Sequence, residues 1–240
     1  MKPGLPLILC TLGLLVATTH ASRAQESDEN RPTARFTVWG DWTGKDLHVE
    51  NPGASPGRDE RYIKLDLLDL GYSAEIPFTR GKPIALCAQL EMDGETLWQP
   101  LIEVKVPPAV REPLVMIFPE DEGTTRYKVY DLDPSTFPFG SYQLVNLTKV
   151  RLFAKLDETG ILLEPGGHGH FKELGPSKLN VWLRVAAEGQ DRNGHIIYSS
   201  MMKNRTDKRM FMFFHPSESS PDAPFAARTL VDFAPSEPGS

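Results

Sequence analysis

The sequence predicts an all-β protein, an antiparallel β-sandwich of one or two units. Apolar and polar residues alternate with a period of two in many short runs, as at Ile63, Leu65 and Leu67. Gly, Pro, Asn and Asp separate these runs, and no window carries the apolar stripe of a long helix, which the 21 prolines would interrupt. Many short strands joined by regular turns are typical of sandwiches.

The first 24 residues have the pattern of a secretory signal peptide. Lys2 supplies a positive start, residues 5–16 are apolar, and Ser22-Arg23-Ala24 matches a small-x-small cleavage site. The apolar stretch is too short for a membrane span, and no later segment approaches about 20 apolar residues. We therefore expect a protein exported to a periplasmic or extracellular compartment, without a transmembrane segment and with residues 25–33 as a flexible lead-in.

The charge and the cysteine content of the chain argue against nucleic-acid binding and against an internal disulfide. Removing the signal would leave 216 residues (240 less 24), with 24 basic against 32 acidic side chains and a net charge of −8. An acidic chain without a basic cluster is not expected to bind nucleic acid. Only Cys87 would remain, which excludes an internal disulfide, and its apolar run 84–88 predicts a buried, unreactive thiol.

The strands are expected in order along the chain, with two turns between them that are specific. Asn193-Gly194 predicts a tight hairpin, and the acidic turn 120–123 lacks the further carboxylates of a calcium loop, which predicts a solvated turn. After three early runs near residues 36–38, 47–49 and 62–67, strands are expected at 82–91, 101–106, 113–118, 125–130, 141–147, 150–156, 179–187, 195–201, 208–214 and 228–233.

A proline-rich segment at 107–112 is the predicted domain boundary, because proline cannot donate to a sheet ladder. It would separate an N-terminal β unit at 34–106 from a C-terminal β-sandwich at 113–234, followed by a tail at 235–240. A single sandwich with a proline-rich crossover is the alternative.

The stretch Phe137–Asn146 carries a resemblance. Gly140-Ser141-Tyr142, just before an expected strand, resembles the tyrosine corner of immunoglobulin-like sandwiches, although no cysteine stands two residues after Tyr142. The resemblance implies an immunoglobulin-like fold in which the Tyr142 hydroxyl ties a turn between sheets to nearby backbone. Through its Pro-x-Gly-x-Tyr-x-x-x-Asn-Leu stretch, and over residues 113–172, the chain also resembles small exported bacterial β-proteins of unassigned function.

Metal binding is the sharpest chemical hypothesis. His168 and His170 alternate with Gly169, so on a strand both imidazoles would face the same side. Met210 and Met212 likewise share one face of a later strand, and imidazoles with thioethers suit copper. Against this, methionine also fills β cores, and Met212 stands between two phenylalanines. The His-x-His pair follows Pro-Gly-Gly, which is ordinary turn chemistry.

Other chemistry has little support. The chain has no Gly-x-Ser-x-Gly elbow and no phosphate-binding glycine loop, so we do not expect an enzyme. Trp39, Trp42 and Trp98 could stack on a glycan, but tryptophan packing in a core is the commoner arrangement. Asn146 and Asn204 match the glycosylation pattern and are also typical of turns or strand ends.

Together these observations predict an exported, non-catalytic β-sandwich module with a binding or structural role in the cell envelope. Its partner would be a protein or another envelope component, met through loops or an exposed edge, and no cofactor is required. A copper-binding protein using His168, His170, Met210 and Met212 is the alternative. The first hypothesis needs Met210 and Met212 buried against phenylalanine, and the second needs them open to solvent beside histidine.

Overall fold

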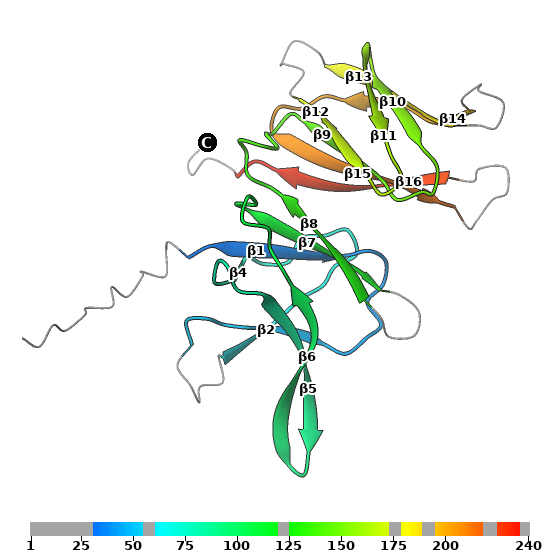
Figure 1. Cartoon of the computed structure of the whole chain (residues 1–240). Coiled ribbons are helices and arrows are strands. Elements are labelled where there is room, and N and C mark those ends of the chain that lie inside the picture. The colour runs from blue at the N-terminus through cyan, green and yellow to red at the C-terminus, as the bar shows by residue number, and fades with distance from the viewer. Residues whose placement is uncertain are drawn as a thin grey trace, which may run out of the picture. The chain divides into compact units, whose positions relative to one another are not determined.

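The computed structural model describes residues 31–54, 61–119, 125–172, 179–188, 195–217 and 225–235, and the chain in these ranges is all β (Figure 1). The predicted signal peptide, most of the lead-in, the Asn193-Gly194 turn, the acidic turn 120–123 and nearly all of the tail lie outside the described residues. Within them, no helix is long and apolar enough to cross a membrane.

The first two sheets share one core. One sheet has the order β4-β1-β7-β8 and the other the order β3-β2-β5-β6. All pairings in them are antiparallel except that of β1 with β7, which is parallel. The strands are β1 (Thr33–Val38), β2 (Leu47–Glu50), β3 (Tyr62–Lys64), β4 (Ile76–Pro77), β5 (Ile84–Met92), β6 (Glu95–Val104), β7 (Pro113–Pro119) and β8 (Thr125–Asp131).

The other two sheets share a second core. Their orders are β12-β9-β15-β16 and β11-β10-β13-β14, with a parallel pairing only between β9 and β15. The all-β sandwich architecture is therefore confirmed. The strands are β9 (Tyr142–Asn146), β10 (Leu152–Leu156), β11 (Thr159–Leu163), β12 (His168–Phe171), β13 (Asn180–Ala187), β14 (His195–Lys203), β15 (Lys208–Pro216) and β16 (Phe225–Phe233).

The sheet pairing does not follow the predicted domain boundary. The segment 107–112 leads from β6 into β7, and β7 pairs with β1 from Arg35↔Leu114 to Val38↔Ile117. Residues 113–131 therefore belong to the same sheet as β1 and β4, and the predicted division into 34–106 and 113–234 needs correction. Because a parallel partner must return by a long connection, the proline-rich segment acts as part of a crossover.

We call the sheets that contain β7 and β15 the inner sheets. Both of these strands bury apolar side chains on their two faces. On β7, Val115 and Ile117 enter the first core, whereas Leu114 and Met116 enter a third cluster. On β15, Phe211 and Phe213 meet that cluster from the other side. We call this third cluster the seam; its buried members are Leu114, Met116, Tyr130, Leu132, Phe137, Val145, Phe211, Phe213 and Leu230. The seam joins the sheet of β7 to the sheet of β15 and makes residues 31–240 one compact unit.

Two hairpins show how local turns set the register. Strands β13 and β14 pair antiparallel up to Ala187↔His195, as expected for the hairpin predicted there. Strand β6 begins at Glu95, six residues before the predicted start, because Asp93 and Gly94 both adopt positive φ (54° and 81°) in a two-residue turn. This Asp-Gly turn matches the twist of a hairpin and extends β5 and β6 together.

Candidate functional site

The predicted copper ligands do not converge. His168 and His170 lie opposite Val145 and Gln143 across the β9–β12 pairing. Since paired residues share a face, both imidazoles lie on the seam side of the sheet, as the His-x-His spacing predicts for a strand. Desolvation lowers the pKa of His168, and electrostatic interactions with Lys128 and His170 lower it further.

Met210 and Met212 lie on the other face of the same sheet. Met212 is 1% exposed in the second core and Met210 packs against that core. They pair with Tyr142 and Leu144 of β9, which face the second core, whereas Val145 of β9 faces the seam. The sheet therefore separates the histidines from the methionines, and the described residues contain no cluster of three or more His, Cys, Asp and Glu that could hold a metal. Met212 is thus a core residue and Met210 is partly buried beside the same core.

The tyrosine-corner stretch has a structural role. Tyr142 is 2% exposed at the start of β9, and its hydroxyl donates to Asn204 Oδ1 at 3.3 Å. A tyrosine corner would use nearby backbone, whereas this bond joins the start of β9 to the residue that follows β14. Asn146 is fully buried, with Nδ2 donating to the Val150 and Leu163 carbonyls at 2.8 and 3.0 Å. Both asparagines of the acceptor pattern are thus strand-end residues engaged in buried hydrogen bonds.

The three tryptophans singled out in the sequence all pack against neighbours. Trp39 contacts the seam and lies under the guanidinium of Arg228, 4.9 Å from the ring centroid. Trp42 packs on the first core, and the ring of Trp98 is stacked on Tyr62 at 3.9 Å. Each of these rings already packs against a neighbour, which favours packing over glycan stacking. Cys87 is free and buried, as predicted, and burial raises the pKa of its thiol with a smaller contribution from Glu50.

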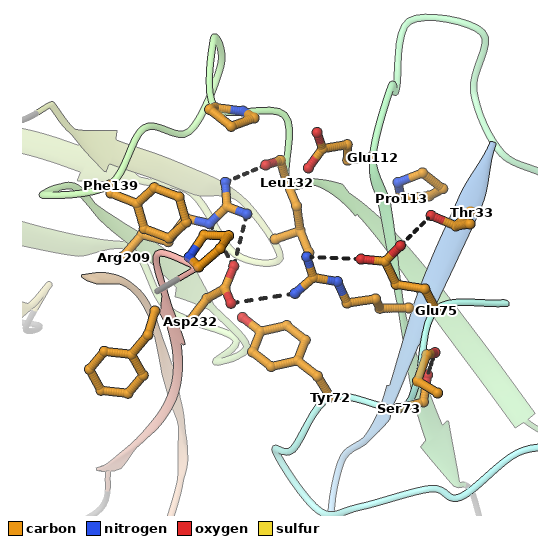
Figure 2. Close-up of a pocket in the computed structure, with 15 residues that line it drawn as sticks. Thr33, Tyr72, Ser73, Glu75, Glu112, Pro113, Leu132, Phe139, Arg209 and Asp232 are labelled. Atoms are coloured by element: carbon orange, nitrogen blue, oxygen red, sulfur yellow. Dashed lines mark hydrogen bonds and ion pairs between the residues drawn. The ribbon is translucent and has the colours of Figure 1, made fainter. Parts of the chain in front are cut away.

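One pocket, of about 620 Å³, lies beside the seam (Figure 2). Its centre is the carboxylate of Asp232, which receives Arg209 Nε at 2.9 Å and Arg35 Nη1 at 3.4 Å. Arg35 also reaches Glu75 at 3.7 Å. Arg209 is 2% exposed and donates to the carbonyls of Leu132 and, at 2.8 Å, Phe137.

The polar groups of this pocket mostly satisfy one another. The arginines, Asp232 and Glu75 form a closed network, whose effect is to hold the segment after β8 against β15 and β16. The Tyr72 hydroxyl is buried and has no hydrogen-bond partner among the described residues, and burial raises its pKa. Because the charges of the two arginines, Asp232 and Glu75 are already paired, we interpret the pocket as a structural junction.

The strongest candidate for binding is the outer face of the sheet β11-β10-β13-β14. Large apolar side chains stand there in two rows with a polar row that contains Lys155 and Arg184 between them, although the other face of the sheet already supplies the second core. One row runs Leu162–Phe153–Ala186–Ile196 across the four strands, and another places Trp182 beside Met201. We call this set the outer face; its exposed apolar members are Phe153 (52%), Leu162 (56%), Trp182 (48%), Ile196 (63%) and Met201 (62%).

The aromatic side chains of the outer face are held in place from below. A Cβ on Gly160 would lie 2.9 Å from Phe153 Cζ, so the Phe153 ring lies across the glycine of the adjacent strand. Trp182 Nε1 donates to Ser199 Oγ at 3.0 Å, which fixes the indole over β14. The surface is therefore an ordered apolar platform.

Sequence reasoning missed the outer face. The signal was available on β13, where Val181, Leu183 and Val185 form the inward set and Trp182 stands at an outward position. A tryptophan on the solvent side of an alternating strand indicates either a further layer or a binding surface.

Comparisons with known proteins add little. No protein-family model and no curated protein matches the chain. A crystal structure of a DUF3823 family protein from Bacteroides ovatus is similar at 12% identity, over 72% of this chain and 97% of that one, with a TM-score of 0.15. A similarity at this level supports no conclusion about fold or function.

Proposed function

We propose that the protein is an exported, non-catalytic binding module that meets a protein partner through the outer face. The observation that carries the proposal is the apolar platform itself. Its five large apolar side chains are each 48–63% exposed, and large apolar side chains gathered on one exposed face often mark an interaction surface. Aromatic residues, Met and Arg, the types present here, are enriched in the cores of protein interfaces.

The charges on the outer face indicate the chemistry of the partner. Arg184 lies in the row between Phe153 and Trp182 and makes no ion pair in the described part of the chain. A partner should therefore place a carboxylate opposite Arg184 and apolar side chains around it, because a charge covered without a partner is costly.

A second copy of the chain is a poor candidate for this partner, because the described rim of its outer face offers no suitable carboxylate for Arg184. The acidic side chains at the rim are already paired, with Glu164 and Glu188 on Arg151 at 3.0 and 3.4 Å and Glu158 on Lys155 at 3.1 Å. A facing copy would thus bring no unpaired carboxylate from these rim positions, and it would bring its own Arg184. A different protein with an acidic, apolar surface is the better match.

The test is capture of partners from extracts of the producing cells with the exported protein as bait. A Trp182→Thr/Met201→Glu variant should lose the partner, because it removes two of the five apolar side chains of the outer face without touching the core. The control is Leu97→Thr/Met92→Glu, which changes side chains of similar exposure (43% and 56%) on the β5–β6 hairpin. Sequencing the bait's N-terminus tests export, for which a mature start at Gln25 is expected.

Equal capture by the two variants would contradict the proposal, as would a partner that binds the outer-face variant as well as the unchanged protein. Light scattering at micromolar concentration is a further check. A dimer that the Trp182→Thr/Met201→Glu change dissociates would show that a second copy, rather than a different protein, covers the outer face.

A further inference from the structure

A second pocket, of about 570 Å³, lies where the seam ends along β8 and β15. On β8, Tyr130 enters the seam, and Lys128 and Arg126 precede it on the same face. On β15, Phe213 fills the seam and His215 follows it. The gap between the two inner sheets is thus filled by apolar side chains in the seam and opens into a pocket beyond it.

The pocket is cationic in a chain that is acidic as a whole. Arg126, Lys128 and Lys149 line it, and no carboxylate belongs to its described lining, whereas the full chain carries −6. Burial lowers the pKa of Lys128, and the charge of Arg126 lowers it further. Lys149 is exposed and makes no ion pair in the described ranges. Clustered positive charges beside low-dielectric walls attract an anion.

The rest of the lining is aromatic or apolar. Trp39, Phe118 and Leu147 contribute ring and aliphatic surface. His215 Nδ1 lies 2.8 Å from the Pro216 carbonyl, so Nδ1 carries the proton. Its Nε2 is buried and has no partner among the described residues. In the neutral ring this nitrogen accepts a hydrogen bond, which a ligand hydroxyl could donate.

We propose that this pocket binds a small organic anion with an aromatic body. Its carboxylate would lie beside Lys149 and Lys128, and its ring would contact Phe118 and Leu147. The volume suits such a ligand, since small-molecule sites measure roughly 300–1,000 Å³ and are mostly apolar with a few placed polar groups. The site is separate from the outer face and takes a ligand of a different class.

The test is isothermal titration calorimetry of the protein with 6-hydroxy-2-naphthoate and with its neutral carboxamide at low salt. The carboxylate should bind with a Kd of about 1 mM or tighter, and the carboxamide about 10-fold more weakly, since only the charge differs. Lys149→Glu should weaken carboxylate binding about 10-fold and raised salt should weaken it as well. Lys82→Glu, at an exposed lysine outside this pocket, should leave the affinity unchanged.

Three results would overturn the proposal. They are equal affinity for the carboxylate and the carboxamide, equal losses in Lys149→Glu and Lys82→Glu, and no binding at millimolar ligand. Trp182→Thr should bind naphthoate like the unchanged protein; a loss there would place the ligand on the outer face instead.

Discussion

Removing the charge of Arg209 should destabilise the protein strongly. The Arg209 side chain is 2% exposed and that of Asp232 10%, so Arg209→Met leaves a largely buried carboxylate with only Arg35, 3.4 Å away, to balance it. Breaking a buried pair by removing one partner costs about 3–5 kcal/mol. Because Arg35 keeps part of the compensation, we expect about 3 kcal/mol, and urea unfolding followed by circular dichroism and tryptophan fluorescence measures it.

Two companion variants separate charge from packing. Arg35→Met should cost about 1 kcal/mol, since this side chain is 26% exposed and exposed pairs contribute little. Arg209→Met/Asp232→Leu should be more stable than Arg209→Met alone, because the double change leaves no carboxylate at this position. A loss below about 1 kcal/mol for Arg209→Met, or no recovery in the double variant, would refute the view that the junction depends on this buried pair.

Three further predictions concern single residues. Asn146→Ala should cost about 3 kcal/mol in urea unfolding, because the fully buried side chain donates to three carbonyls and accepts from Thr148 N at 2.9 Å. Desolvation lowers the pKa of His168 in the folded state, and the charge of Lys128 lowers it further. As the pH falls, the unfolded chain therefore takes up a proton at this residue before the folded chain does. The free energy of unfolding should fall as the pH drops below about 6.5, and it should fall less in His168→Gln. Cys87 should react slowly with a disulfide reagent in the folded protein and rapidly after unfolding, because burial raises the pKa of its thiol.

Local patterns in the sequence were sufficient for the fold class. Alternation of period two predicts strands because one side of a half-buried strand faces a core, and β13 follows this rule, with Val181, Leu183 and Val185 facing inward. The same reasoning placed His168 and His170 on one face. It also gave Met212 a core alternative, which its burial now supports.

The arrangement of the sheets could not be predicted in this way. The parallel pairing of β1 with β7 joins residues about eighty positions apart, and no local signal selects it. One clue was present in the composition of β7 and β9, whose residues at both parities are buried. Strands covered on both faces lose their alternation, so such runs indicate inner sheets. The proline-rich segment 107–112 suggested a boundary, because no local pattern in the sequence shows that it leads into a strand that pairs with β1.

The sites were harder to predict for the same reason. The cationic pocket gathers Lys128, Lys149 and His215 from three separate segments. The copper hypothesis grouped residues by chemistry and spacing, but the β9–β15 register places the histidines and methionines on opposite faces.

The most direct test of the outer face as a partner-binding surface compares the oxidation of two methionines by dilute peroxide. Met201 and Met92 are similarly exposed, at 62% and 56%, and lie on different sheets. In the isolated protein both should oxidise at similar rates, as mass spectrometry of peptides will show. In the complex captured from producing cells, Met201 should be protected and Met92 should not. Equal oxidation of the two methionines in that complex would contradict the assignment of the outer face as the partner-binding surface.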